Sequence, residues 1–402
     1  MDVLRDHPWI CFRPRFELTQ TIQRLAGRAE AMLEELQAQP IKPQLARRLE
    51  VLFLSKSIHG TTSIEGGTLT EAQVQAILEG ATQPDRPSRQ HLVREVLNLQ
   101  RAYAWAGTQT TEALVASAGV RHLHRLIAQD LEHIEAEPGR YRSVMVYVGS
   151  PPYRPPSDRE RDLEGLMHRL GEWLGTARLA DSPFLDALLR AVIAHVYVAW
   201  IHPFQDGNGR TARTLEFGLL LAGGVPRVGA LALSNHYNLT RSIYMRRLSR
   251  SSTDLRGDLT EFIEYALQGF HDGLADALAR VREHVMNTAW ESYVYESFRN
   301  QAGPALSPAQ ARARRLAIEM TTAAPLTRAE LANRFELLYA GRSAKTLTRD
   351  LNLLESMRLL ERVDGRYQSA IGQMRRFTLG WARERRQDDL PPEHAPVLAP
   401  VP

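Results

Sequence analysis

The segment His202-Pro-Phe-Gln-Asp-Gly-Asn-Gly-Arg-Thr-Ala-Arg213 joins two apolar runs, Phe184–Trp200 before it and Thr211–Leu221 after it. The first run is apolar on nearly every side, which predicts a helix buried in the core. The second has apolar residues at helical spacing and stops at Gly223, a residue type that commonly follows the end of a helix. The segment therefore predicts a loop between two core helices, within a mostly α fold.

The loop carries the residue types of a polyphosphate site. Gly207, Asn208 and Gly209 precede the second helix, and glycines permit the positive φ values that let backbone N–H groups converge on an anion. The helix would direct the positive end of its dipole at the same point. Arg210 and Arg213 are one turn apart, and their planar guanidinium groups suit phosphate.

Two more residues of the loop predict metal binding and proton transfer. Asp206 is a hard oxygen ligand suited to Mg²⁺ that bridges phosphates. His202 titrates near neutrality and can accept a proton from an incoming hydroxyl, while Phe204 would anchor the loop. A histidine before proline or a Gly-Asn-Gly turn is commonly structural when it stands alone. Together within one short segment, these features favour a catalytic site.

The segment resembles the Fic motif, His-x-Phe-x-(Asp/Glu)-Gly-Asn-Gly-Arg-x-x-Arg, at every defined position. The resemblance implies an α-helical core that transfers AMP from ATP to a protein hydroxyl, and the modified protein can be the chain itself. It implies that His202 is the base, that Asp206 binds Mg²⁺ and that Gly207 to Arg210 hold the phosphates of ATP. Tyr244 falls where the family places an aromatic residue near the nucleotide, although Met245 stands where a second tyrosine is usual.

A second stretch, Thr61-Thr-Ser-Ile-Glu65-Gly66, resembles the inhibitory motif of the same family, (Ser/Thr)-x-x-x-Glu-(Gly/Asn). The resemblance implies that Glu65 reaches into the site and pairs with Arg213, which would otherwise meet the γ-phosphate. ATP would then bind unproductively and the resting enzyme would be weak. The alternative is an exposed glutamate at a helix end.

A third stretch predicts a β-hairpin. Pro138-Gly139 is a turn signal, and Arg142–Val148 alternates polar and β-branched residues as a strand does. It resembles the family's flap, which holds the target segment over the site by strand pairing. The residues expected to dock the target are Val146, Tyr147, Val148 and Gly149. The alternative is a hairpin that only covers the surface.

The C-terminal part reads as a separate unit. Thr327–Phe335 and Ser343–Glu355 have the pattern of two helices, and two short strands around the turn at Asp364-Gly365 would follow them. The order resembles a winged helix-turn-helix, in which Ser343, Lys345, Thr346 and Arg349 could reach DNA. Residues 304–386 hold 16 Lys and Arg against 8 Asp and Glu, which suits a phosphate backbone. Winged helices also dock proteins or form dimers, so DNA binding and a homodimer both stay open.

We divide the chain accordingly into a series of regions: 1–110, a helical region with the inhibitory motif; 111–283, the Fic core; 284–310, a helical connector; 311–386, the winged helix; and 387–402, an acidic, proline-rich tail expected to be disordered.

Composition limits the remaining possibilities. Of the 402 residues, 44% are hydrophobic and 24% charged, which is ordinary for a globular protein. A single cysteine excludes a disulfide framework, and His122, His124 and His195 show no metal-ligand pattern, so we expect no zinc. Since no uncharged apolar run is long enough to cross a bilayer and the N-terminus does not fit a signal peptide, we expect a cytoplasmic protein with no membrane partner.

Three other functions remain compatible with the sequence. The same site could remove AMP from a modified protein, with Glu65 orienting a water. It could use another nucleotide donor, because the motif specifies phosphates better than a base. The chain could also be a DNA-binding regulator that only senses nucleotide, although such a sensor would not need a base at His202.

Overall fold

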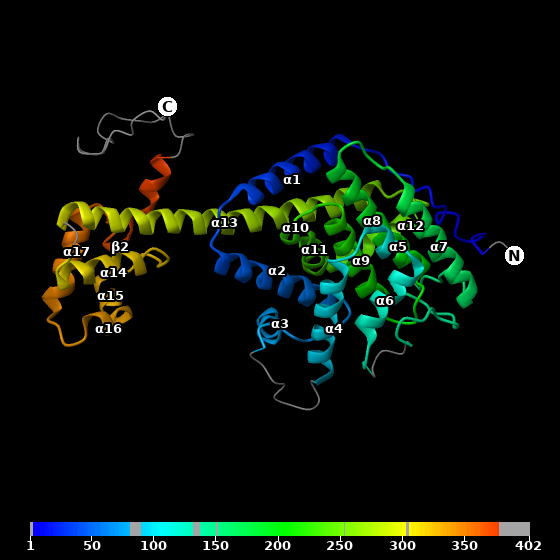
Figure 1. Cartoon of the computed structure of the whole chain (residues 1–402), viewed down its shortest axis with the longest axis horizontal. Helices are drawn as coiled ribbons and strands as arrows, with labels where there is room; N and C mark the ends of the chain where they lie inside the picture. Colours follow the sequence, from blue (N-terminus) through cyan, green and yellow to red (C-terminus); the bar gives the residue numbers. More distant parts are fainter. Residues whose placement is uncertain are drawn as a thin grey trace. The chain divides into compact units, whose positions relative to one another are not determined.

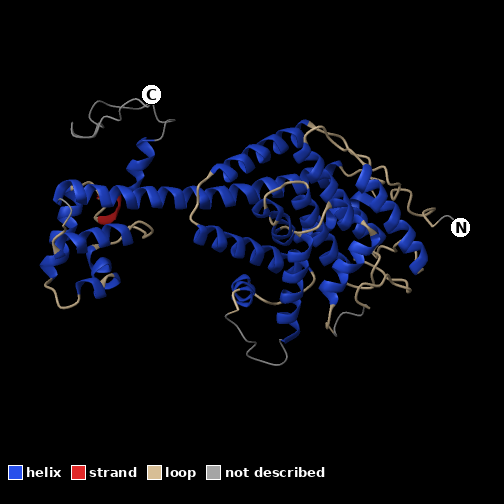
Figure 2. Ribbon diagram, viewed as in Figure 1, coloured by secondary structure: helices blue, strands red, loops and turns tan. Residues whose placement is uncertain are grey.

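The computed structural model describes residues 3–80, 90–131, 137–149, 152–252, 254–302 and 305–377. They divide into two compact units, an N-terminal unit (Met1–Val281) and a C-terminal unit (Arg282–Pro402). Figures 1 and 2 show that helices build most of both units. The predicted mostly α fold is therefore confirmed. The tail 387–402 lies outside the described residues.

The N-terminal unit is a helical bundle around two adjacent core helices, α8 (Pro183–Ile201) and α9 (Asn208–Ala222). The helices that surround them are α1 (Gln20–Ala38), α2 (Pro43–Ile64), α3 (Glu71–Leu78), α4 (Gln90–Ala106), α5 (Thr111–Val115), α6 (Ser117–Ala128), α7 (Glu160–Thr176), α10 (Arg227–Ala230), α11 (Ala232–Leu239), α12 (Arg241–Ser252) and the first half of α13 (Thr260–Ala302).

The core helix α8 is long and apolar enough to cross a membrane by length and composition alone. However, 78% of its apolar window is buried inside the protein, as expected for a central helix. Ser182 caps its start by accepting a hydrogen bond from the Leu185 N–H, and Pro183 stands at the first helical position, where the absent N–H costs nothing.

The helix α9 begins earlier than the apolar pattern predicts. Gly207 takes the left-handed conformation with φ 79°, and the helix starts at the next residue, so Asn208 to Arg210 form its first turn. These residues therefore place their backbone N–H groups at a helix N-terminus, where they lack partners within the helix.

The α2 helix approaches the core closely, and its C-terminal end carries the stretch that resembles an inhibitory motif. A Cβ built on Gly60 would lie 2.6 Å from the carbonyl oxygen of Ser234 on α11, so only glycine fits at this crossing. The last turn of α2 ends at Ile64, and Glu65 is its C-cap residue. The packing of α2 therefore fixes where the carboxylate of Glu65 can reach.

The segment predicted as a strand over Arg142–Val148 is mostly irregular. Its one antiparallel bridge joins Val148 to Tyr153, with N–H to carbonyl hydrogen bonds of 2.9 and 2.8 Å in the two directions. The hairpin is thus reduced to a single pair, and Arg142 lies buried instead of continuing the alternation. The reason is that Arg142 bonds to the backbone carbonyls of His202 and Pro203, in the loop between α8 and α9.

The C-terminal unit contains helices and one two-stranded antiparallel sheet. Its elements are the second half of α13, α14 (Pro308–Glu319), α15 (Arg328–Arg334), α16 (Glu336–Tyr339), α17 (Ala344–Ser356), β1 (Leu360–Val363), β2 (Arg366–Ser369) and the 3₁₀ helix Ala370–Phe377. Leu360 pairs with Ser369 and Val363 with Arg366, on either side of the predicted turn. The two helices and two strands lie close to their predicted bounds, while the assignment as a winged helix stays a prediction.

A separate core supports this unit. Trp290 and Phe298 of α13 pack with buried residues of α14 and α17, among them Leu316 and Leu351. The helix α13 runs unbroken from Thr260 to Ala302, so the region predicted as a connector is largely the second half of that helix.

Candidate active site

The loop between α8 and α9 is shaped by two residues with positive φ and by one amide. His202 ends α8 in the left-handed conformation with φ 50°, which is strained for a residue with a side chain. The Asn208 side chain accepts a hydrogen bond from the Phe204 N–H at 2.9 Å and donates one to the Phe204 carbonyl at 2.7 Å. The side chain of Asn208, a residue that the sequence predicts to help hold the phosphates of ATP, therefore also fixes the conformation of the loop.

Arg142 holds the backbone at His202. Its N–H donates to the Pro203 carbonyl at 2.9 Å and its Nε donates to the His202 carbonyl at 2.8 Å. Its NH1 group donates to the Val144 carbonyl at 2.8 Å. The buried guanidinium thus joins the flap segment to the turn that presents the candidate base.

The imidazole of His202 is set to remain neutral. Burial lowers its pKa to about 4, and the positive charge of Arg142 acts in the same direction. The charges of Glu65 and Asp206 oppose this shift but do not reverse it. A neutral imidazole is the form that can accept a proton, so His202 is fit to act as a general base over a wide pH range.

Asp206 lies at the turn itself, with its carboxylate 42% exposed. Its Oδ1 accepts hydrogen bonds from the Gly207 N–H and, at 3.2 Å, from the Arg210 guanidinium. Arg210 is turned into the protein, where its NH1 donates to the buried Glu95 at 2.5 Å. Sequence reasoning missed Glu95, because a buried acid on a distant helix leaves no local signal.

The residues present fit a magnesium ion only if the nucleotide helps to bind it. Among the described residues, no group of three or more His, Cys, Asp or Glu side chains could hold a metal. Mg²⁺, however, is commonly held by one or two carboxylates and by substrate phosphates, and the half-exposed carboxylate of Asp206 beside a helix N-terminus meets that need. Asp206 is therefore the residue that would hold the ion, which would neutralise phosphate charge there.

Arg213 and Glu65 form an ion pair across the start of α9. The Arg213 NH2 group donates to Glu65 Oε1 at 2.6 Å, and its Nε donates to the Thr61 hydroxyl at 2.7 Å. Arg213 is 1% exposed, whereas a third of the Glu65 side chain is exposed. A Cβ built on Gly209 would lie 2.2 Å from Glu65 Oε1, so the carboxylate lies directly over the first turn of α9.

This pair is charged. Burial alone would raise the pKa of Glu65, but the nearby guanidinium of Arg213 and its hydrogen bond outweigh burial and lower the pKa below its ordinary value. Burial would likewise lower the pKa of Arg213, and the charge of Glu65 outweighs it and raises that pKa. Glu65 thus supplies an anion at the place where the sequence predicts phosphate.

Tyr244 belongs to a buried polar network behind the pair. Its hydroxyl lies 2.9 Å from His195 Nε2, and its ring stacks on Tyr237 with centroids 4.8 Å apart. The Tyr237 hydroxyl donates to Glu216 at 2.9 Å, and His195 Nδ1 lies 3.2 Å from the same carboxylate oxygen. Burial raises the pKa of Tyr244 to about 12, so the tyrosine stays protonated. His195 is indeed buried in the core, but in contact with a residue of the site.

One cavity of about 1080 Å³ brings most of the predicted residues together. Its lining includes Glu65, Val148, Gly149, His202, Asn208, Gly209, Arg213 and Tyr244. The lining does not include Asp206, Gly207, Arg210, Val146 or Tyr147. Tyr147 is 67% exposed, so the flap contributes to the cavity through its last two predicted residues.

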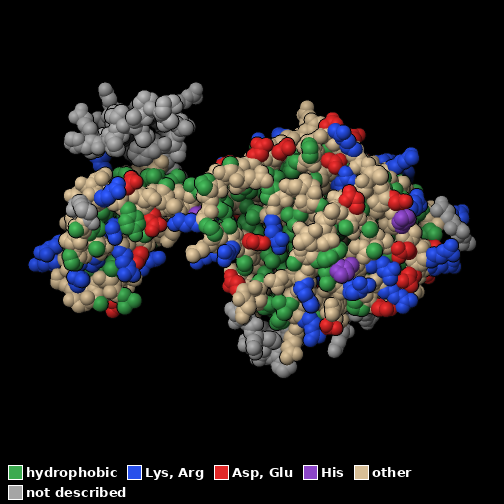
Figure 3. All heavy atoms as spheres, viewed as in Figure 1, with side chains coloured by type: hydrophobic (Ala, Val, Ile, Leu, Met, Phe, Trp, Pro, Cys, Tyr) green, Lys and Arg blue, Asp and Glu red, His purple; other side chains and the backbone are tan. Residues whose placement is uncertain are grey.

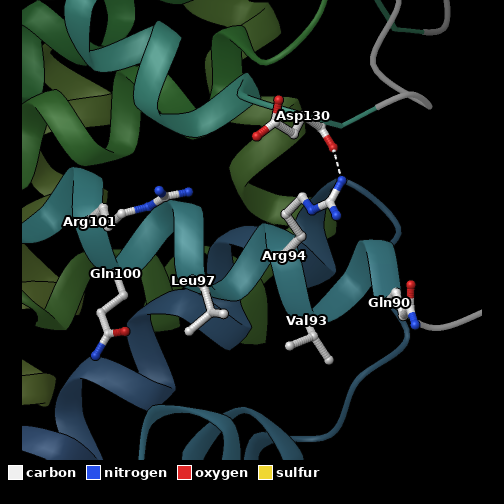
Figure 4. A pocket seen from close by; sticks show the side chains of 7 residues that line it. All are labelled: Gln90, Val93, Arg94, Leu97, Gln100, Arg101 and Asp130. Atoms are coloured by element: carbon white, nitrogen blue, oxygen red, sulfur yellow. Dashed lines mark hydrogen bonds between the residues drawn. The ribbon is translucent and has the colours of Figure 1, made fainter. Parts of the chain in front are cut away.

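The cavity also has a wall that sequence reasoning did not anticipate. His7 and Trp9 from the start of the chain line it, together with Arg154. The His7 Nε2 lies 2.7 Å from the Arg154 carbonyl, and the His7 and Trp9 rings meet edge to face. A second cavity, of about 570 Å³, lies along α4 near Leu97 and Asp130 and contains none of the predicted site residues (Figure 4).

Residues 115–220 match the family model described as Fic/DOC family. This stretch is a Fic domain. The matched range holds the whole loop from His202 to Arg213, while Glu65 precedes it and Tyr244 follows it.

The Fic domain lies in a chain that resembles longer curated proteins. The chain is 29% identical over 265 residues to the protein adenylyltransferase Fic of Drosophila grimshawi. The matched residues cover 61% of this chain and 52% of that protein. The chain is 33% identical over 175 residues to the protein of the same name from Nematostella vectensis, covering 42% and 38%. The chain thus spans about half the length, or less, of these curated relatives.

Solved structures agree on the fold. A Fic family protein from Desulfovibrio desulfuricans G20 superposes with a TM-score of 0.55 at 21% identity, over 89% of this chain and 98% of that one. Fic-1 of Caenorhabditis elegans superposes with a TM-score of 0.50 at 24% identity, over 65% and 72% of the two chains. The helical Fic architecture is therefore shared with both.

Proposed function

We propose that this chain transfers AMP from ATP to a Ser, Thr or Tyr hydroxyl of a protein, including its own, and that Glu65 holds the reaction at a low resting rate. The observation that carries the proposal is the Glu65–Arg213 pair over Gly209, in the cavity that His202 also lines. Curated relatives named protein adenylyltransferase Fic support the transfer.

The proposed reaction uses these residues as follows. The phosphates of ATP lie at the N-terminus of α9, where Asp206 would hold Mg²⁺. The acceptor oxygen forms a bond to the α-phosphorus while the bond from that phosphorus to the oxygen leading to the β-phosphate breaks, and pyrophosphate leaves. The acceptor proton passes to His202. Positioning and charge stabilisation supply most of the rate enhancement.

Autoinhibition follows from competition for one guanidinium. While Glu65 pairs with Arg213, the γ-phosphate has no partner there, and the like charge of the carboxylate repels it. Because Glu65 ends a helix and is one-third exposed, it can leave toward solvent without unfolding α2.

The test is self-modification with α-labelled ATP and Mg²⁺. We expect strong labelling of Glu65→Gly, weak labelling of the unmodified chain and none of Glu65→Gly with His202→Ala. γ-Labelled ATP should label none of them, because the label leaves with pyrophosphate. Labelling from γ-labelled ATP, or labelling that persists without His202, would contradict the proposal.

Two alternative reactions at the same site separate in one further assay. If the reaction runs in reverse, pre-labelled protein should release labelled AMP, and Glu65→Gly should abolish that release. If the donor is another nucleotide, α-labelled GTP, CTP or UTP should label the protein better than ATP.

A second candidate function, DNA binding, is favoured by one observation on the C-terminal unit. Three exposed basic residues follow one another at helical spacing, namely Arg342 just before α17 and Lys345 and Arg349 within it. On the opposite side of α17, Leu347 and Leu351 are buried. None of the three basic side chains makes an ion pair with another described residue. Lys and Arg side chains form several clusters on the face of this unit that Figure 3 shows.

DNA binding should depend on salt and on this face. A duplex that binds at low salt should bind more weakly to Arg349→Ala, with a smaller salt slope. Arg315→Ala is the matched control, because Arg315 is exposed on α14 and pairs with Glu319. Equal losses from both variants, or no binding at low salt, would exclude α17 as a DNA-reading helix. A cytoplasmic location and a homodimer stay predictions.

A further inference from the structure

His124 lies outside the Fic motif yet contacts the centre of its loop. The residue is on α6 and is fully buried. Its Nδ1 accepts a hydrogen bond from the Gly139 N–H at 2.9 Å, so Nδ1 carries no proton. Its Nε2 therefore carries the proton and donates to the Asp206 carbonyl, 3.0 Å away.

The imidazole is held in this orientation by its packing. It lies parallel to the Phe204 ring, with centroids 3.7 Å apart and an angle of 5° between the planes. A Cβ built on Gly207 would lie 3.1 Å from His124 Nε2, at a residue whose φ is 79°. The ring thus fills the space beside the turn, and glycine suits that position for both reasons.

Both sides of the Asp206–Gly207 peptide are restrained. His124 bonds to the carbonyl of this peptide, and the Asp206 carboxylate accepts the N–H of the same peptide. Rotation of the peptide would move the carboxylate with it. Loop folding does not depend on this contact alone, because Asn208 locks the loop independently at Phe204.

We propose that His124 is a positioning residue that fixes the Asp206–Gly207 peptide, and through it the carboxylate that takes Mg²⁺ with the nucleotide. The proposal rests on the function proposed above, to which it adds a residue from outside the motif. The same imidazole joins the turn at Gly139, which begins the flap segment, to the turn that holds the metal ligand.

Three substitutions separate the contacts of His124. His124→Phe keeps the stacking on Phe204 and removes both hydrogen bonds. His124→Asn can keep the acceptor for Gly139, since its amide oxygen lies near the place of Nδ1, but cannot reach Asp206. His124→Gln can place an amide N–H near the position of Nε2 and so keep the bond to Asp206.

The experiment measures ATP affinity with Mg²⁺ and with EDTA, for the full chain carrying Glu65→Gly. We expect Mg²⁺ to strengthen ATP binding. We expect this increase in affinity to be about tenfold smaller in His124→Phe and in His124→Asn, which is the size typical when a partner of a metal ligand is removed. Affinity in EDTA should not change, and His124→Gln should keep most of the gain. Thermal unfolding of each variant serves as the control for folding.

Other results would overturn the proposal. Equal gains from Mg²⁺ in all four proteins would mean that His124 does not position the ligand. Equal losses of affinity in Mg²⁺ and in EDTA would indicate a general structural role. If Mg²⁺ does not strengthen binding even with His124 intact, the metal role of Asp206 is wrong and the proposal falls with it.

The assay does not require transfer of AMP. If the binding pattern appears as expected but no protein is labelled, the role of His124 stands and the transferase proposal fails. If the protein is labelled but the variants do not differ in the effect of Mg²⁺, the transferase proposal stands and the role of His124 fails.

Discussion

Two arginine–carboxylate pairs in this chain use the same chemistry in different surroundings. In the C-terminal unit, Arg312 meets Asp350 through two hydrogen bonds of 2.6 and 2.9 Å, and both side chains are less than a tenth exposed. In the N-terminal unit, Arg213 meets only one oxygen of Glu65, and a third of that glutamate is exposed. Tyr339 donates a further hydrogen bond to Asp350 at 2.9 Å.

We interpret the Arg312–Asp350 pair as structural and the Arg213–Glu65 pair as the switch proposed above. The carboxylate of Asp350 is on α17 and has no route to water, so losing its partner would leave a charge in the core. Glu65 lies at the end of α2, so an anion from solution can replace its carboxylate as the partner of Arg213. The bonds from the Nε and NH2 groups of Arg213 to Thr61 do not involve Glu65, so we expect them to keep the guanidinium in position for phosphate when Glu65 leaves.

The largest effect should come from breaking the structural pair. Asp350→Ala leaves Arg312 charged and buried, and we expect it to lower the free energy of unfolding of the C-terminal unit by about 3–5 kcal/mol. Hydrogen exchange followed by mass spectrometry should show faster exchange in α14 and α17. AMP transfer by Glu65→Gly should not change when Asp350→Ala is added, provided the assay temperature keeps this unit folded.

Breaking the other pair should raise activity instead. We expect Glu65→Gly to increase the rate of self-labelling by about two orders of magnitude, near the upper end of coupling energies between linked sites, with a small change in the unfolding temperature. Glu65→Gln is the matched control, since it keeps the size of the side chain and removes its charge. A strongly destabilised Glu65→Gly without a gain in labelling would mean that this pair, too, is structural.

The contrast also shows what the sequence could predict. The residues of the Fic motif follow one another in the chain, so their spacing predicts the α8–loop–α9 unit, while the meeting of Glu65 with Arg213 is implied by the resemblance to the Fic family. The partners of those residues could not be predicted in the same way. Glu95 contacts Arg210 from α4, and His124 contacts Asp206 from α6. These contacts depend on how distant helices pack, and a single sequence contains no record of which side chains face each other.

The flap illustrates the opposite case, in which a local pattern is overridden. Its alternating valines predict a strand over Arg142–Val148, but no neighbouring strand pairs with most of it in the described chain. Arg142 instead uses its N–H and its guanidinium on the His202 turn. An alternating sequence forms a strand only where a partner strand is available to pair with it. Here the backbone N–H of Arg142 bonds to a loop instead.

A smaller effect should come from the residue that holds Arg213 in both states. In the Glu65→Gly chain, Thr61→Val removes the hydroxyl that accepts from Arg213 Nε and should raise the KM for ATP by about tenfold, the equivalent of about 1.4 kcal/mol for a hydrogen bond to a charged group. Thr62→Val is the matched control, because the Thr62 hydroxyl bonds only to carbonyls of its own helix, at Ile58 and His59. Equal KM values for the two variants would mean that Thr61 does not orient Arg213.

The smallest expected effect is the pH dependence of activity. It distinguishes the two arginine–carboxylate pairs because Glu65 acts on the pKa of His202. His202 has a pKa of about 4, and its neutral form is the base, so activity should be lost only as the pH falls toward that value. We expect the kcat of Glu65→Gly, at saturating ATP and Mg²⁺, to change less than about twofold between pH 6 and 8, since at pH 6 roughly 1% of an imidazole with this pKa is protonated. The negative charge of Glu65 raises the pKa of His202, so its removal should move the acid limb of the profile to lower pH, not higher. Asp350→Ala, which changes a charge in the other unit, should leave the limb where it is. An acid limb near the ordinary histidine pKa of about 6.5 would mean that His202 is solvated when it reacts, and that burial at the end of α8 does not set its protonation state.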